Sequence, residues 1–115
     1  MRTTRGKQLT QNDAHEVALR LDLDDRYLIM NCINESLEIV DPALFSLRTG
    51  GERDAAIVLH RQIAASGQGA TSMSVDAVEL ARKCVIVALD LVDAPEFQSR
   101  TGYDLADAQR LRDRA

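Results

Sequence analysis

The residue types that most often act as nucleophiles, bases or metal ligands are scarce in this chain. It has two histidines, His15 and His60, and two cysteines, Cys32 and Cys84. No cysteine or carboxylate accompanies either histidine at a catalytic spacing. The cysteines stand among apolar neighbours, where a thiol packs as a small hydrophobic side chain. The H-E-x-x-H, C-x-x-C, P-loop and G-x-S-x-G motifs do not occur in the sequence. We therefore predict no catalytic residue, no metal site and no cofactor, and we expect that the chain is not an enzyme.

Polar side chains that could recognise a partner follow one face of a predicted helix. Asn31, Asn34, Glu35 and Glu38 fall at positions i, i+3, i+4 and i+7, which share one side of an α-helix. One interpretation is that this polar stripe simply faces solvent. The other is that two carboxamides flanked by carboxylates form a recognition surface.

The same stripe changes character in the second half of the chain. The residues 52 positions further on are Lys83, Ile86, Val87 and Asp90. Two bulky aliphatic side chains at a position predicted to face water need a cover. Either an N-terminal helix covers Ile86 and Val87, or these residues form a dimer or partner interface.

A second motif occurs twice, as F-S-L-R-T-G at residues 45–50 and F-Q-S-R-T-G at residues 97–102. We expect the Phe to fill a gap between helices and the Gly to adopt a left-handed turn. The Thr is expected to cap the next helix. Arg48 and Arg100 would satisfy helix-terminal carbonyls or pair with a preceding aspartate. Alternatively, the two arginines bind an anion or an acidic partner, although no Gly-rich phosphate loop accompanies them.

Both motifs belong to a longer internal repeat. Residues 31–61 align without a gap on residues 83–113, with ten identical pairs. The identities fall at predicted helix ends and turns, so we interpret the repeat as a tandem duplication of one helix–turn–helix unit. The first unit covers residues 24–66 and the second covers residues 74–115.

Each unit is predicted to contain a long helix, a short helical segment and a second helix. In the first unit the long helix runs from a cap at Asp24 to Val40, and the last helix begins with a T-x-x-E capping box at residues 49–52. In the second unit Ser74 caps a helix that continues to Val92. The β-branched run at residues 84–92 also suits a buried strand, but its partner in the repeat is clearly helical.

The remaining segments complete the predicted fold. An extra helix is expected from about Thr10 or Asp13 to Leu21, a Gly- and Ser-rich loop at residues 67–72, and a disordered tail at residues 1–8. The fold class is therefore all-α, a small bundle of about five helices plus two short ones. Its 115 residues suit a single domain.

The first unit resembles a set of small, uncharacterised bacterial helical proteins. The residues that carry the resemblance are N-C-I-N-E at 31–35, followed by F-x-x-R-x-G at 45–50. It covers about residues 27–63, and the second unit keeps only the F-x-x-R-x-G part. The resemblance implies an architecture and a recognition face, and it implies no reaction.

Charge and hydropathy limit the partners and the location that we expect for the chain. The net charge is −4, and the basic residues Arg2, Arg5 and Lys7 stand together near the N-terminus. An acidic body argues against binding along a phosphate backbone, so nucleic acid is not the expected partner. The longest uninterrupted apolar run, residues 84–89, is too short to span a membrane, and no signal peptide is readable. We therefore expect a cytoplasmic protein without a membrane partner.

These observations predict a non-enzymatic protein-binding or regulatory module, of which a toxin-neutralising immunity protein is one form. Its partner is another protein or a second copy in a homodimer, and no small-molecule substrate is indicated. The alternative is a nucleic-acid-associated regulator that uses the basic N-terminal arm. The candidate binding residues are Asn31, Asn34, Glu35, Glu38, Arg48, Arg100, Ile86 and Val87.

Overall fold

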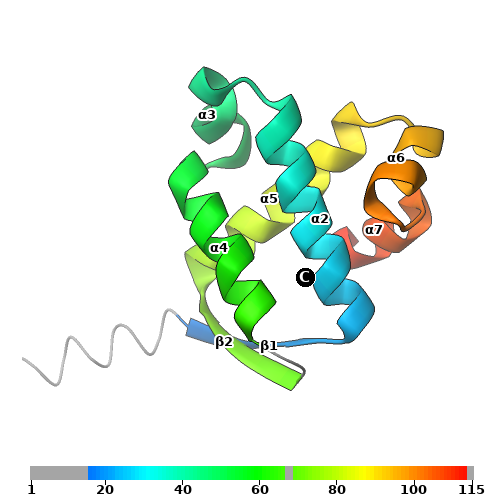
Figure 1. The fold of residues 1–115 in the computed structure, drawn as a ribbon. Coiled ribbons are helices and arrows are strands. Elements are labelled where there is room, and N and C mark those ends of the chain that lie inside the picture. The colour runs from blue at the N-terminus through cyan, green and yellow to red at the C-terminus, as the bar shows by residue number, and fades with distance from the viewer. Residues whose placement is uncertain (1–15, 67–68, 114–115) are drawn as a thin grey trace, which may run out of the picture.

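Helices make up most of the fold in the computed structural model of the chain, which describes residues 16–66 and 69–113 (Figure 1). The elements in chain order are β1 (Glu16–Leu21), α2 (Leu23–Ile39), the 3-10 turn η1 (Pro42–Leu44), α3 (Phe45–Thr49), α4 (Arg53–Ala65), β2 (Gly69–Ser74), α5 (Val75–Leu91), α6 (Ala94–Thr101) and α7 (Leu105–Asp113). The predicted all-α class is confirmed, with six α-helices in the described part of the chain.

A short antiparallel ribbon is the main departure from the prediction. β1 pairs with β2 so that Glu16 lies opposite Ser74 and Leu21 lies opposite Gly69. The predicted N-terminal helix is therefore wrong at residues 16–21, and its earlier part lies outside the described residues. The predicted loop is also wrong at residues 69–72, which belong to β2, and its first two residues lie outside the described part of the chain. The sequence E-V-A-L-R-L places Val or Leu at every second position, which is the period of a strand.

The two longest helices, α2 and α5, pack against each other at the centre of the fold. In Figure 1, α3 and α4 lie to one side of this pair and α6 and α7 to the other. Asp22 caps α2 by accepting a hydrogen bond from the Asp25 backbone N–H at 2.7 Å, so the predicted cap at Asp24 is wrong. Ser74 caps α5 as predicted, accepting from the Ala77 N–H at 3.1 Å. The strand alternative for residues 84–92 is excluded, since α5 covers nearly all of them.

The two F-x-x-R-T-G corners have the same geometry. Gly50 and Gly102 end α3 and α6 with φ angles of 80° and 83°, in the left-handed region that glycine adopts readily. Phe45 and Phe97 are both fully buried. The predicted roles of the Phe and Gly residues are therefore confirmed.

The threonines of these corners act differently from the prediction. The Thr49 hydroxyl donates to the Phe45 carbonyl at 2.9 Å, and both residues belong to α3. Thr49 was expected to cap the next helix, α4. The Thr101 hydroxyl donates to the Phe97 carbonyl at 2.7 Å. Glu52 is the N-cap residue of α4 and makes no capping hydrogen bond with its side chain, so the predicted capping box is wrong. Each threonine closes the helix before it rather than opening the one after it.

The buried apolar side chains form one hydrophobic cluster that draws on both halves of the chain. Its largest fully buried members include Ile33 from α2, Ile63 from α4 and Val85 from α5. Met73 extends the cluster to the ribbon. Within residues 16–66 and 69–113, no helix has both the length and the apolar character to cross a membrane.

Candidate functional site

The predicted polar stripe on α2 is in part a contact with α6. Glu35 is only 8% exposed, and its Oε1 accepts a hydrogen bond from Arg100 Nη1 at 2.7 Å. Asn31 is half-buried, and its Nδ2 donates to the Thr101 carbonyl at 2.8 Å. Asn34 and Glu38 are exposed. The interpretation of the whole stripe as a solvent face is therefore wrong at Glu35 and incomplete at Asn31.

The two predicted anion-binding arginines have different surroundings. Arg100 contacts three carboxylates, with Glu96 at 3.5 Å and Glu38 at 3.9 Å in addition to Glu35. The hydrogen bond and the charge of Glu35 raise the pKa of Arg100. Arg48 is exposed, and its side chain has no hydrogen bond or ion pair with any other described residue. The structure does not bring the two arginines together, and Arg100 is already occupied by internal carboxylates.

The expectation that Ile86 and Val87 both face water is wrong for Val87. Val87 is 4% exposed and belongs to the core, whereas Ile86 is half-buried. Position 87 aligns with Glu35, which is also buried, so this position faces inward in both long helices. The inward carboxylate of α2 needs Arg100, and the inward valine of α5 needs no charge partner. This difference explains why Arg48, which aligns with Arg100, has no ion pair within residues 16–66 and 69–113.

We expect Arg100→Gln to destabilise the chain, because it leaves the mostly buried Glu35 carboxylate without its cation. Adding Glu35→Val, the residue of the other half, should recover stability. Arg48→Gln is the matched control and should leave urea unfolding unchanged. Equal effects of Arg48→Gln and Arg100→Gln would contradict the assigned ion pair.

The two thiols are unsuited to nucleophilic chemistry. Both are free and buried, and burial raises the pKa of Cys32 to about 12 and that of Cys84 to about 11. A neutral thiol is a poor nucleophile and a poor metal ligand. Among the described residues, no group of three or more His, Cys, Asp or Glu side chains could hold a metal ion.

A groove of about 710 Å³ lies between α4 and α5. Its apolar lining comes from both helices and the α3–α4 corner, and charged groups stand around it. The lining residues are Thr49, Gly50, Gly51, Asp54, Ala55, Val58, Leu59, Gln62, Ser74, Asp76, Ala77, Glu79, Leu80 and Lys83. Sequence analysis did not single out this surface.

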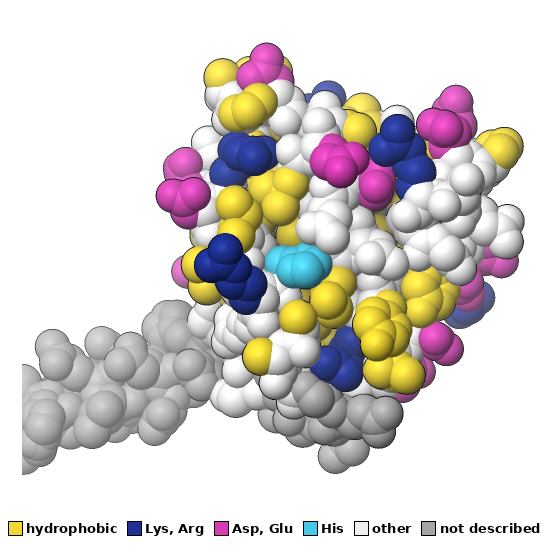
Figure 2. Space-filling view, viewed as in Figure 1, with side chains coloured by type: hydrophobic (Ala, Val, Ile, Leu, Met, Phe, Trp, Pro, Cys, Tyr) yellow, Lys and Arg dark blue, Asp and Glu magenta, His cyan; other side chains and the backbone are white. Residues whose placement is uncertain are grey.

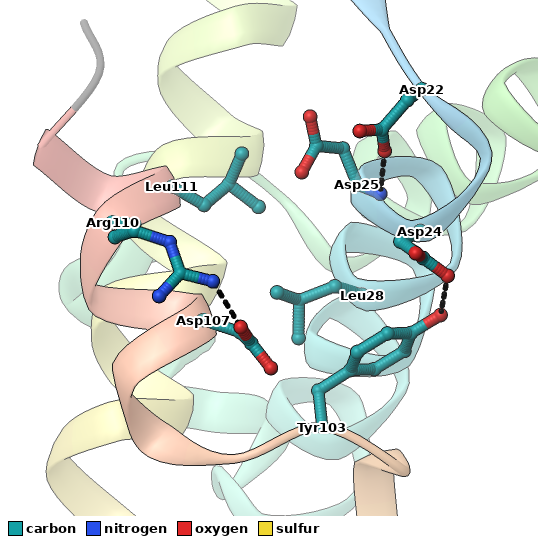
Figure 3. A pocket seen from close by; sticks show the side chains of 8 residues that line it. All are labelled: Asp22, Asp24, Asp25, Leu28, Tyr103, Asp107, Arg110 and Leu111. Carbon is teal, nitrogen blue, oxygen red and sulfur yellow. Dashed lines mark hydrogen bonds and ion pairs between the residues drawn. The ribbon is translucent and has the colours of Figure 1, made fainter.

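A second cleft, of about 490 Å³, lies between α2 and α7 (Figure 3). Leu28 and Leu111 point toward each other across it. The Tyr103 hydroxyl donates to Asp24 Oδ1 at 3.1 Å, and Arg110 pairs with Asp107 within α7. The remaining lining residues are Asp22 and Asp25.

The cleft and the groove occupy corresponding places in the two halves. Each of the eight residues that line the cleft aligns with a residue 52 positions away that lines the groove. We call two residues at this offset counterparts of each other. Three of the eight pairs are identical: Asp24 with Asp76, Leu28 with Leu80, and Leu111 with Leu59.

The other five pairs show how the two surfaces differ. Tyr103 of the cleft has Gly51 as its counterpart, and Arg110 has Val58. Three aspartates of the cleft, at positions 22, 25 and 107, correspond to Ser or Ala in the groove. The groove is therefore larger and more apolar than the cleft. The residue differences that cause this are visible in the sequence when the two halves are aligned at the offset of 52.

Comparison of the chain with protein-family models, with curated proteins and with solved structures found no match. The resemblance of residues 27–63 to small bacterial helical proteins stays a prediction. The geometry of the groove and the cleft is therefore the basis for inferring a function.

Proposed function

We propose that this chain is a non-enzymatic protein-binding module and that the α4–α5 groove is its binding site. The observation that carries the proposal is the open groove of about 710 Å³, which joins an apolar lining to charged rims. Grooves of this kind receive a protein segment through its apolar side chains, while the rim charges select its flanks.

The groove offers apolar surface that a partner could cover. Val58 is 58% exposed at the groove, beside the exposed Ala55 and the buried Leu59. Covering an aliphatic side chain contributes about 1.5–3 kcal/mol when its burial is complete, so a few such contacts support specific binding. The two cysteine thiols are buried and have raised pKa values, which makes them poor nucleophiles.

The rim charges favour a basic partner. Asp54, Asp76 and Glu79 are exposed around the groove, with Lys83 as the only basic residue among those that line it. An acidic rim attracts a cationic surface and repels a phosphate backbone. Neutralisation of a basic toxin, the immunity-type role, is one form of this proposal. A nucleic-acid regulator has less support, because its basic arm lies outside the described residues and the face in Figure 2 mixes both charge signs.

Two finer points belong to the same proposal. A cytoplasmic location suits two free thiols, because such compartments keep cysteines reduced. Duplication of one unit explains why α2 and α5 begin and end 52 residues apart and why the groove mirrors the cleft. A homodimer through Ile86 and Val87 loses its basis, since Val87 is buried.

A photo-crosslinking residue at Val58 is expected to capture one discrete protein in cells of the native host, because a bound partner covers this side chain. The same residue at Arg110, the exposed counterpart of Val58 in the cleft, serves as the matched control. Mass spectrometry of the adducts identifies the partner. No discrete adduct at Val58, or the same adducts at both positions, would argue against the groove as the binding site.

A further inference from the structure

We infer that the α4–α5 groove binds a tyrosine side chain of a partner protein, whose phenol hydroxyl donates a hydrogen bond to Asp76. The inference rests on the proposed function and names the side chain that the groove recognises. Its basis is the cleft in the other half, which shows the same residue frame with a tyrosine in place.

In the α2–α7 cleft the tyrosine is part of the chain itself. Tyr103 follows the α6 corner, and its hydroxyl lies 3.1 Å from Asp24 Oδ1 near the first turn of α2 (Figure 3). Its ring lies beside Leu28. Burial and the hydrogen bond to Asp24 raise the pKa of Tyr103, so the phenol keeps the proton that it donates.

The α4–α5 groove has the same aspartate and leucine that lie beside the tyrosine in the cleft, but no tyrosine is among the residues that line it. Asp76 and Leu80 are the counterparts of Asp24 and Leu28, and Gly51 stands where the other half has Tyr103. Asp76 is exposed, and its carboxylate accepts no hydrogen bond from any other described residue. The groove is also larger than the cleft, at about 710 against about 490 Å³. An aromatic side chain from outside would supply the ring that the groove lacks at Gly51.

Leu80 approaches Gly51 closely, so it takes part of the room that a side chain at position 51 would need. A Cβ atom added at Gly51 would lie 3.0 Å from Leu80 Cδ1 and 3.2 Å from Leu80 Cδ2. Both are ends of a flexible side chain, and Gly51 does not have a positive φ angle, so Gly51→Tyr requires the end of Leu80 to shift by a few tenths of an ångström. Such a variant would supply the missing ring from within the chain.

The rim predicts the neighbours of the bound tyrosine. Asp54 and Asp76 belong to the first turns of α4 and α5, and neither has an ion pair among the described residues. Glu79 adds a third carboxylate, although it pairs with Arg82 at 3.2 Å. Basic residues beside the tyrosine would therefore complement the rim.

The test is a titration of the full isotope-labelled chain, followed by amide NMR, with the peptides acetyl-Arg-Tyr-Arg-amide and acetyl-Arg-Phe-Arg-amide. We expect saturable shifts at Gly51, Val58 and Leu80, and about fivefold to tenfold tighter binding of the tyrosine peptide, since only its ring carries a hydroxyl that can donate to Asp76. Asp76→Ala should abolish this preference. Asp24→Ala, its counterpart in the cleft, should leave the preference unchanged. Gly51→Tyr should abolish binding of both peptides.

Several results would overturn the inference. These are equal affinity for the two peptides, shifts that avoid the groove, or unchanged binding by Asp76→Ala. The chain has one other tyrosine, Tyr27, which is 49% exposed on α2. Groove shifts that follow protein concentration alone and vanish in Tyr27→Ala would show that the groove binds Tyr27 of a second copy. If Gly51→Tyr does not fold, Asp76→Ala still tests the inference, because Asp76 is exposed in the first turn of α5. Crosslinking at Val58 without any tyrosine preference would keep the proposed function and overturn only this inference.

Discussion

Replacing Phe97 with alanine is expected to lower the free energy of unfolding by about 3–5 kcal/mol, and Phe45→Ala should have an effect of the same size. Both rings are fully buried, at equivalent places before the two glycine corners. Removing either ring leaves a cavity among side chains that have no other aromatic to fill it. Urea unfolding followed by circular dichroism measures the change.

Leu47→Ala is the control for these two variants, because Leu47 lies in α3 close to Phe45 but is 82% exposed. It should change stability by no more than about 0.5 kcal/mol. A loss below about 1 kcal/mol for Phe97→Ala would contradict the assigned core, as would a much smaller effect for one ring than for the other.

Alkaline pH is expected to weaken the fold through the two buried thiols. Their pKa values are raised from 9.0 to about 12 for Cys32 and about 11 for Cys84, chiefly by burial, and the charge of Cys84 adds to the shift of Cys32. The unfolded chain therefore releases both protons near pH 9, while the folded chain keeps them. The thiols add no pH dependence below about pH 8. Between about pH 9 and 11, we expect them to lower stability by about 1.4 kcal/mol per pH unit for each thiol.

The matched control is the double variant Cys32→Ala with Cys84→Ala. Tyrosine and lysine side chains titrate in the same range, and they do so in both proteins. The difference between the two stability curves therefore isolates the thiols. We expect the double variant to lose stability less steeply across this alkaline range, whatever its absolute stability at neutral pH. Parallel curves would contradict the raised pKa values of the two thiols.

Local sequence patterns predict the helix corners well, because the determinants lie within a few residues. A left-handed glycine ends a helix by its own backbone freedom, and both Gly50 and Gly102 do so. The threonines were misassigned for a related reason. Their hydroxyls reach the preceding Phe carbonyl within the same turn, which competes with the capping role that the T-x-x-E spacing suggests.

Long-range contacts account for the other differences. The strand at residues 16–21 depends on pairing with residues 69–74, and no local pattern reveals that partner. The pair of Glu35 and Arg100 joins residues 65 positions apart, which turns part of a presumed solvent stripe into an interior contact. Arg53 is a similar case, since its Nη1 donates to the Leu37 carbonyl at 2.9 Å. Spacing along one helix cannot show which helix will lie opposite.

The groove was missed because α4 and α5 come together only in the folded chain. The repeat alignment nevertheless held the relevant difference, with Gly51 opposite Tyr103. Aligned positions that differ between two halves of a repeat are thus informative once the structure shows which surface they share. Val87 is a further example, because its counterpart Glu35 also faces inward.

The central claim is that the α4–α5 groove binds a protein partner. Its most direct test is the dissociation constant of the partner captured at Val58, measured by calorimetry for the wild type and for Gly51→Tyr. The variant fills the groove from within and leaves the surface outside the groove unchanged. We predict that Gly51→Tyr, shown to be folded by its amide spectrum, weakens binding at least about tenfold, which corresponds to about 1.4 kcal/mol. An unchanged dissociation constant with a filled groove would contradict the account.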